Sequence, residues 1–302
     1  MMMSLIECSK LLLETEYSEL RTCFDSESGV LWTLVSQDEV PCVTNELLEN
    51  LLHHHDTIKK CDGQILLQNG VFDIRYSVMA SLTPDVFNLG GQLALFRKLI
   101  DRRDRAGLLA YATKCIDVIF PRICRFDSSL CTITLIQGDA LGGGLEAALA
   151  SDIVIAERHC QMGFPEILFN LFPGMGAYSL IARKVGNRLA EKMMLSGKIY
   201  SAQELHEIGL VDVLAEDGEG EKAVHDFIKK QERRANGFRA IQKVRQRYNP
   251  VTYQELIDIT TIWVEAALKL NEKDLKVMDR LVRSQERNFV HSREEQPRLY
   301  AA

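Results

Sequence analysis

The 302-residue chain has none of the features typical of a disulfide-bonded, zinc-binding or membrane protein. No two of its cysteines form a C-x-x-C pair, and charged residues interrupt the N-terminal leucines, unlike a signal peptide. No run approaches the ~20 apolar residues that cross a bilayer. We therefore expect a cytoplasmic protein without membrane insertion, in which the eight cysteines are reduced, buried thiols.

Positive charge is also in deficit, with 36 Lys and Arg against 42 Asp and Glu. Nucleic-acid-binding proteins usually carry a positive surplus, so the net charge of −6 predicts no nucleic-acid partner. The basic runs at 102–105 and 229–234 are interpreted as solvated helix faces, with a docking patch for an acidic carrier protein as the alternative. His53–His55 is interpreted as a solvated helix end, because consecutive histidines point in different directions and chelate poorly.

Strands and helices alternate through the first two thirds of the chain, which predicts an α/β architecture. Strands are expected at 30–35, 65–67, 72–78, 130–137 and 152–156, and helices at 10–20, 41–55, 92–101, 107–125 and 145–151. Helices dominate after Gly176, one of them begun by a Ser201–Glu204 capping box and two long ones at 222–246 and 253–287. We divide the chain into an N-terminal extension (1–28), an α/β core (29–210) and a helical C-terminal region (211–302).

The most informative segment is a glycine-rich turn between an apolar strand and a helix, Gly142-Gly143-Gly144. Glycines there adopt positive φ and leave N–H groups open, and the start of a helix favours a developing negative oxygen. Glu146 follows in the first turn of that helix. A dinucleotide fingerprint, G-x-G-x-x-A, also fits these letters, but Glu157 comes only 15 positions after Gly142, against ~20 for a ribose-binding acid.

Two other segments carry weaker signals. Glu166 follows Pro165 in an apolar stretch, where desolvation would tune a carboxyl toward proton exchange near neutral pH. A surface glutamate that caps the next helix is the alternative. Gly90-Gly91 stands at the entrance of a predicted helix and would present a second open amide.

Together these segments resemble the crotonase (enoyl-CoA hydratase/isomerase) superfamily over about residues 30 to 215. The matching motifs are Gly90-Gly91-Gln92-Leu93, Ala140 through Glu146, Pro165-Glu166 through Gly176, and Ser201-Ala202 through Val211. The resemblance implies a spiral of strand–strand–helix turns with a helical C-terminal region. It also implies oxyanion-hole amides from Gly91 and Gly143, an acid/base pair of Glu146 and Glu166, and no cofactor or metal. Gln92 departs from the aspartate that most members have.

Within the superfamily the chain is similar to diffusible signal factor synthases, on the basis of the Phe87–Phe96 stretch, the extended N-terminus and the helical tail around Trp263. That similarity implies dehydration of a medium-chain 3-hydroxyacyl thioester, bound to acyl carrier protein or CoA, and then thioester hydrolysis to a free cis-2-unsaturated fatty acid used as a quorum signal. It further implies trimers or dimers of trimers and a regulatory sensor-kinase partner. The substrate-binding residues that it implies are Gly90, Gly142, Gly174, Met175, Trp263 and Leu281. An ordinary core position for Trp263 stays open.

The paired carboxyls fit this chemistry for a physical reason. Elimination of water from C2 and C3 needs a base for the C2 proton and an acid for the 3-hydroxyl, whereas a double-bond shift can use one carboxyl. The sequence contains no G-x-S-x-G elbow, so a serine-hydrolase route has no motif support. The alternatives are an enoyl-CoA hydratase of fatty-acid metabolism and a non-catalytic scaffold or RNA-binding protein of the same fold.

Overall fold

The computed structural model describes residues 4–294, with side chains as far as Ser284. The strands are β1 (Leu20–Asp25), β2 (Val30–Val35), β3 (Gln64–Leu67), β4 (Gly70–Asp73), β5 (Tyr76–Ser81), β6 (Asp85–Asn88), β7 (Cys131–Ile136), β8 (Gly138–Leu141), β9 (Ile153–Glu157), β10 (Gln161–Gly163), β11 (Ile199–Ser201) and β12 (Val213–Ala215). The helices are α1 (Leu5–Glu14), α2 (Asn45–Lys60), α3 (Leu93–Asp101), α4 (Arg105–Ile123), α5 (Gly143–Leu149), α6 (Ala177–Val185), α7 (Asn187–Ser196), α8 (Ala202–Glu207), α9 (Gly220–Glu232), α10 (Ala235–Tyr248), α11 (Tyr253–Ala267) and α12 (Glu272–Glu294). Two short 3₁₀ helices, η1 (Arg125–Asp127) and η2 (Pro165–Phe169), complete the described chain.

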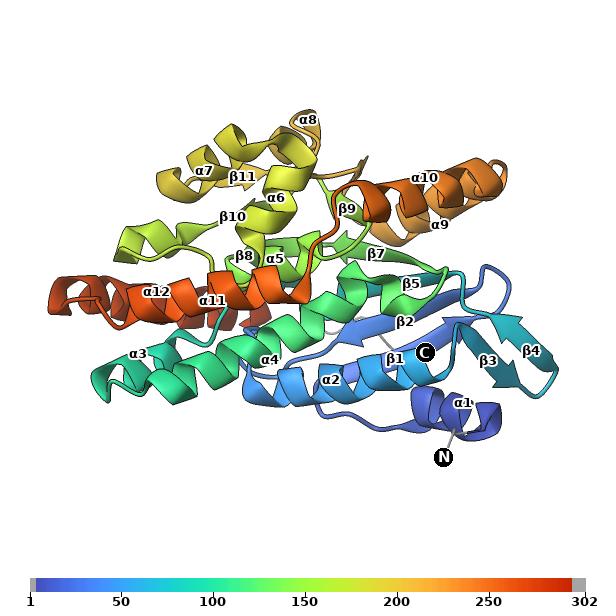
Figure 1. Ribbon diagram of the computed structural model, residues 1–302, viewed down its shortest axis with the longest axis horizontal. Coiled ribbons are helices and arrows are strands. Elements are labelled where there is room, and N and C mark those ends of the chain that lie inside the picture. The colour runs from blue at the N-terminus through green and yellow to red at the C-terminus, as the bar shows by residue number, and fades with distance from the viewer. Residues whose placement is uncertain (1–3, 295–302) are drawn as a thin grey trace.

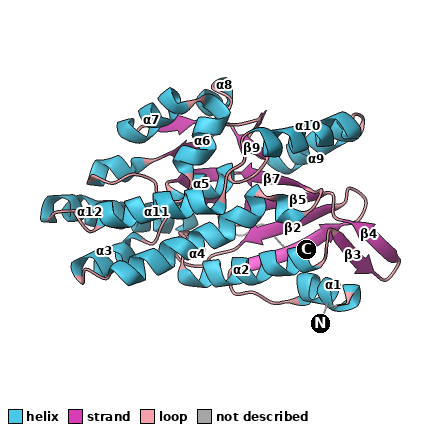
Figure 2. Cartoon of the chain, viewed as in Figure 1, coloured by secondary structure: helices cyan, strands magenta, loops and turns pink. Residues whose placement is uncertain are grey.

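The strands form two main sheets, and the chain passes repeatedly from the larger sheet to the smaller one (Figures 1 and 2). The larger sheet has the order β1-β2-β5-β7-β9-β12, parallel except for β1, and the smaller has the order β11-β10-β8-β6. Each of β5, β7 and β9 belongs to the larger sheet, and the strand that follows it belongs to the smaller one. Helices come after each such pair, so the predicted spiral of strand–strand–helix turns is confirmed.

Helices cover both faces of the larger sheet, which explains the continuous apolar runs in its strands. Every residue of β7 and β9 is buried, as is typical of parallel strands between two layers. On one face, α9 contributes Val224 and Ile228 to a cluster with strand residues such as Ile133 and Ile155. The opposite face packs on α2, α4, α5 and the small sheet in the main hydrophobic core.

The N-terminal segment is more structured than its sequence indicated. Residues 1–28 contain α1, which begins at a Ser4–Glu7 capping box, and β1, which pairs antiparallel with β2 at the edge of the larger sheet. The predicted helix at 10–20 therefore lies too far along the chain. The strand predicted over 72–78 is divided, because Ile74 and Arg75 separate β4 from β5.

The helical C-terminal region is broken into shorter pieces than expected. The segment 222–246 forms α9 and α10, and 253–287 forms α11 and α12. The Ser201–Glu204 capping box is confirmed at the start of α8, with both reciprocal hydrogen bonds present. Two short strands, β11 and β12, also lie in the stretch after Gly176 that was predicted to be helical.

The prediction of a solvated helix end at His53–His55 is wrong for His54 and His55, although His53 is exposed. These residues lie inside α2, which continues to Lys60, and both His54 and His55 are fully buried. His54 Nε2 lies 2.9 Å from Thr33 Oγ1, and His55 Nδ1 lies 3.0 Å from the Val118 carbonyl oxygen. Burial lowers the pKa of His54 to about 3, so these histidines are neutral members of the core.

Other predictions from composition agree with the structure in part. All eight cysteines are free, but only five of them are buried, and Cys23 is exposed. Lys229 and Lys230 are exposed on α9, as a solvated helix face requires, whereas Arg102 and Arg103 are exposed in the turn after α3. Within residues 4–294, no helix combines the length and the apolar character that crossing a bilayer demands.

Candidate active site

The candidate site lies where three neighbouring strands of the small sheet end. Strands β10, β8 and β6 are adjacent and parallel, so their carboxyl ends meet at one edge. Past that edge, β6 leads to Gly90-Gly91, β8 leads to the glycine turn before α5, and β10 leads to Pro165-Glu166. The three motifs singled out in the sequence are therefore brought together by topology.

Two backbone amides face the same space at this edge. A Cβ atom added to Gly143 would lie 3.4 Å from the Gly91 nitrogen, and one added to Gly90 would lie 3.2 Å from the Gly143 nitrogen. Within the described residues, neither the Gly91 nor the Gly143 N–H makes a hydrogen bond. Gly143 is the first residue of α5, where N–H groups have no partner inside the helix. The two amides therefore lie close together, as the predicted oxyanion hole requires.

The turn that presents Gly91 is fixed by hydrogen bonds. Gly90 has φ +93° and donates its N–H to Asn88 Oδ1 over 2.8 Å. The Gly90 carbonyl accepts from the Val43 N–H over 2.8 Å. Asn88 also packs against α5, because a Cβ on Gly144 would lie 2.2 Å from the Asn88 carbonyl oxygen. Asn88 thus joins the two amide-bearing segments.

Sequence reasoning gave Asn88 no role, although the pattern held a usable signal. An asparagine two residues before a glycine is typical of a side chain that accepts from the backbone of a turn.

Glu146 is buried beside the glycine turn, at 1% exposure. Its Oε1 accepts the N–H groups of Met175 (2.8 Å) and Ala177 (2.9 Å), in the loop before and at the start of α6. Burial raises the pKa of Glu146 to about 7, although the two hydrogen bonds oppose that rise. The carboxyl is thus held in one orientation and exchanges its proton near neutral pH.

Glu166 lies in η2, opposite Gly142. A Cβ on Gly142 would lie 2.3 Å from Glu166 Oε1, and Glu166 Oε2 is buried with no hydrogen-bond partner in the described structure. Burial, and then the charge of Glu146, raise the pKa of Glu166 to about 8. Two carboxyls of raised pKa therefore lie close enough to affect one another, as an acid and base pair requires.

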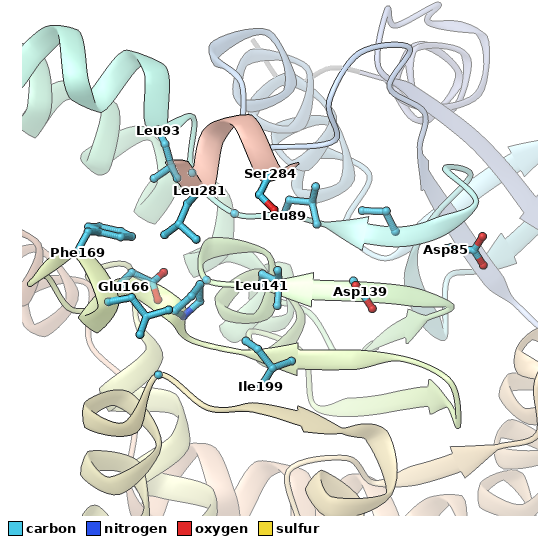
Figure 3. Close-up of a pocket in the computed structure, with 17 residues that line it drawn as sticks. Asp85, Leu89, Leu93, Asp139, Leu141, Glu166, Phe169, Ile199, Leu281 and Ser284 are labelled. Atoms are coloured by element: carbon cyan, nitrogen blue, oxygen red, sulfur yellow. The ribbon is translucent and has the colours of Figure 1, made fainter. Parts of the chain in front are cut away.

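A cavity of about 360 Å³ borders Glu166 (Figure 3). Gly143 and the buried Glu146 are not among the residues that line it. Glu166, Phe169 and Leu281 lie toward one end of it, and Asp85 and Asp139 lie toward the other (Figure 3). Most of its other walls are apolar, and Leu281 and Ser284 belong to α12, which forms one side. Gly90, Gly91 and Gly142 also contact the cavity.

The other predicted substrate-binding residues do not line the cavity. Gly174, Met175 and Trp263 are not among the residues that line the cavity, and Trp263 is 2% exposed. Its ring packs against Phe96, with 5.1 Å between ring centroids, and against Gly174. Trp263 therefore occupies the core position that the sequence left open, and Leu281 is the predicted side chain that reaches the cavity.

Comparison with known proteins agrees with this geometry. Residues 121–260 match the enoyl-CoA hydratase/isomerase family. Enoyl-CoA hydratase from Bacillus halodurans shares the fold, with a TM-score of 0.71, 20% identity and coverage of 87% of this chain and 100% of that one. The chain therefore has the crotonase fold, and the expected fold is confirmed.

Individual relatives differ in how much of the chain they match. The probable mitochondrial enoyl-CoA hydratase 2 of Arabidopsis thaliana is 28% identical over 224 residues, 72% of this chain and 68% of that protein. The 2,3-dehydroadipyl-CoA hydratase of Escherichia coli is 40% identical over 100 residues, 33% of this chain and only 38% of its own length. DspI of Pseudomonas aeruginosa has 22% identity and a TM-score of 0.65, with coverage of 95% of this chain and 98% of that one.

Proposed function

We propose that this protein is a member of the crotonase superfamily that interconverts 3-hydroxyacyl and 2-enoyl thioesters by removing or adding water across C2 and C3. The single observation that carries the proposal is the position of Glu166, whose carboxyl contacts Gly142 at the cavity beside the open amides of Gly91 and Gly143. The hydratases among the matched relatives support the same reaction class.

The residues divide the reaction between them. The thioester oxygen accepts the N–H groups of Gly91 and Gly143, which stabilise the enolate by about 3 kcal/mol per donor, as in other oxyanion holes. One carboxylate of the Glu146–Glu166 pair removes the C2 proton. The other, as the acid, protonates the 3-hydroxyl, which leaves as water. The raised pKa values of both groups favour a pair that carries one proton near pH 7.5.

We further propose that the enoyl thioester is hydrolysed in the same site to release a free 2-unsaturated fatty acid. A glutamate takes a proton from water, whose oxygen adds to the thioester carbonyl, and the same two amides hold the tetrahedral oxyanion. The C–S bond then breaks, and the leaving thiolate takes the proton from the glutamate. Relatives matched by sequence include hydratases named for CoA thioesters, so a CoA thioester is tested beside one on a carrier protein.

The experiment is incubation of the purified protein with 3-hydroxydodecanoyl carrier protein and, separately, 3-hydroxydodecanoyl-CoA, followed by mass spectrometry of lipids and thioesters. Free 2-dodecenoic acid supports dehydration with hydrolysis. Reversible formation of 2-dodecenoyl thioester without free acid supports the hydratase alternative. Absence of both products from both substrates would overturn the proposal and leave the non-catalytic alternative. The homotrimer, the sensor-kinase partner and the cis geometry stay predictions.

A further inference from the structure

Helix α11 contacts both halves of the candidate site from behind. Thr260 is fully buried on this helix, and its Oγ1 donates to the Gly174 carbonyl over 3.1 Å. Gly174 immediately precedes Met175, whose N–H holds Glu146 Oε1. The hydrogen bond of Thr260 therefore fixes the loop that orients one carboxyl of the pair.

Trp263 lies one turn further along the same face, three residues after Thr260. Its ring fills the space beside Gly174, where a Cβ would lie 2.3 Å from Trp263 Cγ. The ring also packs edge-on against Phe96, at 5.1 Å between centroids and 68° between planes. Phe96 in turn covers Gly91, where a Cβ would lie 2.6 Å from Phe96 Cζ. Trp263 is thus linked to the loop of Glu146 and to the amide of Gly91.

We propose that Thr260 and Trp263 are positioning residues, through which α11 holds the Glu146 carboxylate and the Gly91 amide in one fixed relative arrangement. This inference rests on the proposed function, since it assigns these residues a part in that reaction. Neither residue is proposed to contact the acyl chain, because neither lines the cavity.

The direction of the effect follows from the hydrogen bonds. The N–H groups of Met175 and Ala177 stabilise the ionised form of Glu146 and so oppose the rise in its pKa that burial causes. Loss of the Thr260 bond frees the Gly174 carbonyl and loosens that loop. The pKa of Glu146 should then rise further, and the carboxylate form should become scarcer at neutral pH.

The experiment uses Thr260→Val, which keeps the shape and removes the donor, with Thr260→Ser as the conservative variant. Thr261→Val is the matched control, because Thr261 Oγ1 bonds only within α11, to the Ile257 carbonyl. In full-length protein with ¹³C-labelled glutamate, NMR follows the titration of Glu146, assigned by its loss in Glu146→Gln. A shift of about one unit upward is expected for Thr260→Val, with wild-type values for Thr260→Ser and Thr261→Val.

Kinetics gives the second readout. If the pKa of Glu146 rises by one unit, the acidic limb of the pH profile of kcat should move upward by the same amount. At pH values below that limb, kcat should be about tenfold lower, with KM nearly unchanged. For Trp263→Phe, the account predicts a fall in kcat that is equal for short and long acyl chains. A change confined to KM for long chains would instead place Trp263 in acyl binding and overturn its part of the inference.

The outcomes separate the two proposals. An unchanged Glu146 titration in a folded Thr260→Val variant would overturn the inference whatever reaction the protein catalyses. If Thr260→Val does not fold, Thr260→Ala takes its place. A Glu146 titration and a kcat equal to those of the wild type in Thr260→Ala would overturn the inference. Failure of the proposed function would appear separately, as full activity in Glu146→Gln.

Discussion

The Glu166 carboxyl and the Cα of Gly142 lie so close that a methyl group on Gly142 would reach within 2.3 Å of Glu166 Oε1. Gly142 also has φ +51°, a conformation that L-residues with side chains rarely adopt. The glycine is therefore needed twice, once for the turn into α5 and once to leave room for the carboxyl. This contact connects two motifs that are separated by 24 residues in the sequence.

Gly142→Ala should abolish most of the activity, because the new methyl group displaces the Glu166 carboxyl from the cavity. The strained backbone should also cost about 1–3 kcal/mol of unfolding free energy. Gly186→Ala is the matched control, since Gly186 has φ +88° but nothing within 4 Å of its added Cβ. That control should lose stability and keep kcat. Equal loss of kcat in both variants would contradict the account.

Replacement of either carboxyl should remove proton transfer at one stage of the reaction. Glu146→Gln and Glu166→Gln are each expected to lower kcat by roughly 10²- to 10⁴-fold, measured by enoyl thioester formation. Glu221→Gln, at an exposed position on α9, serves as the control and should be neutral. If both site variants retain full activity while folded, the pair does not carry the chemistry.

The pH dependence of activity should be bell-shaped. With pKa values raised to about 7 for Glu146 and about 8 for Glu166, the singly protonated pair is most abundant between these values. The rate should fall below about pH 7, where both carboxyls are protonated, and above about pH 8, where both are ionised. A rate that stays constant from pH 5 to pH 9 would rule out this acid/base pair.

Glu166→Gln should stabilise the protein at alkaline pH. Folding raises the pKa of Glu166 from 4.5 to about 8, so the folded state binds this proton more tightly than the unfolded state does. Stability is therefore lost as pH rises from about 4.5 to about 8, and a neutral glutamine avoids that loss. Urea unfolding should show Glu166→Gln more stable than wild type by about 1–3 kcal/mol at pH 8, with little difference at pH 4.5. The opposite sign at pH 8 would indicate a carboxylate that the site stabilises.

Asn88 should act through the turn that presents Gly91. Asn88→Ala removes the acceptor of the Gly90 N–H, so the Gly91 amide loses its fixed direction and kcat should fall by about tenfold to a hundredfold. Asn88→Asp keeps an acceptor oxygen in the same place and should retain more activity. A larger loss in Asn88→Asp than in Asn88→Ala would argue against this positioning role.

Most elements of the fold could be predicted from patterns of neighbouring residues. The glycine turn, the Ser201–Glu204 capping box and the apolar runs of β2, β7 and β9 depend on neighbouring residues, and each was recognised. His54 and His55 were misplaced because their partners, Thr33 and the Val118 carbonyl, are distant in sequence. Strand β1 was missed for a related reason, since half of its side chains face away from the core and its pairing comes from β2.

The site also contains residues that short motifs identify and residues whose roles depend on contacts distant in sequence. Its glycines and glutamates lie in short motifs, so their residue types and spacing identified them. The positioning residues do not lie in such motifs. Thr260 contacts Gly174 across 86 positions of sequence, and no pattern around Thr260 predicts that contact. For Trp263 the sequence left an acyl-pocket wall and a core position open, because its contacts with Phe96 and Gly174 exist only after α11 has packed.

The most direct test of the central account is to incubate the protein with 2-dodecenoyl carrier protein in H₂¹⁸O and locate the label by mass spectrometry. The account predicts ¹⁸O at C3 of the 3-hydroxyacyl group and in the carboxyl of released acid, with both signals lost in the Glu146→Gln, Glu166→Gln double variant. Label at neither position in the wild-type protein, or undiminished label in the folded double variant, would contradict it.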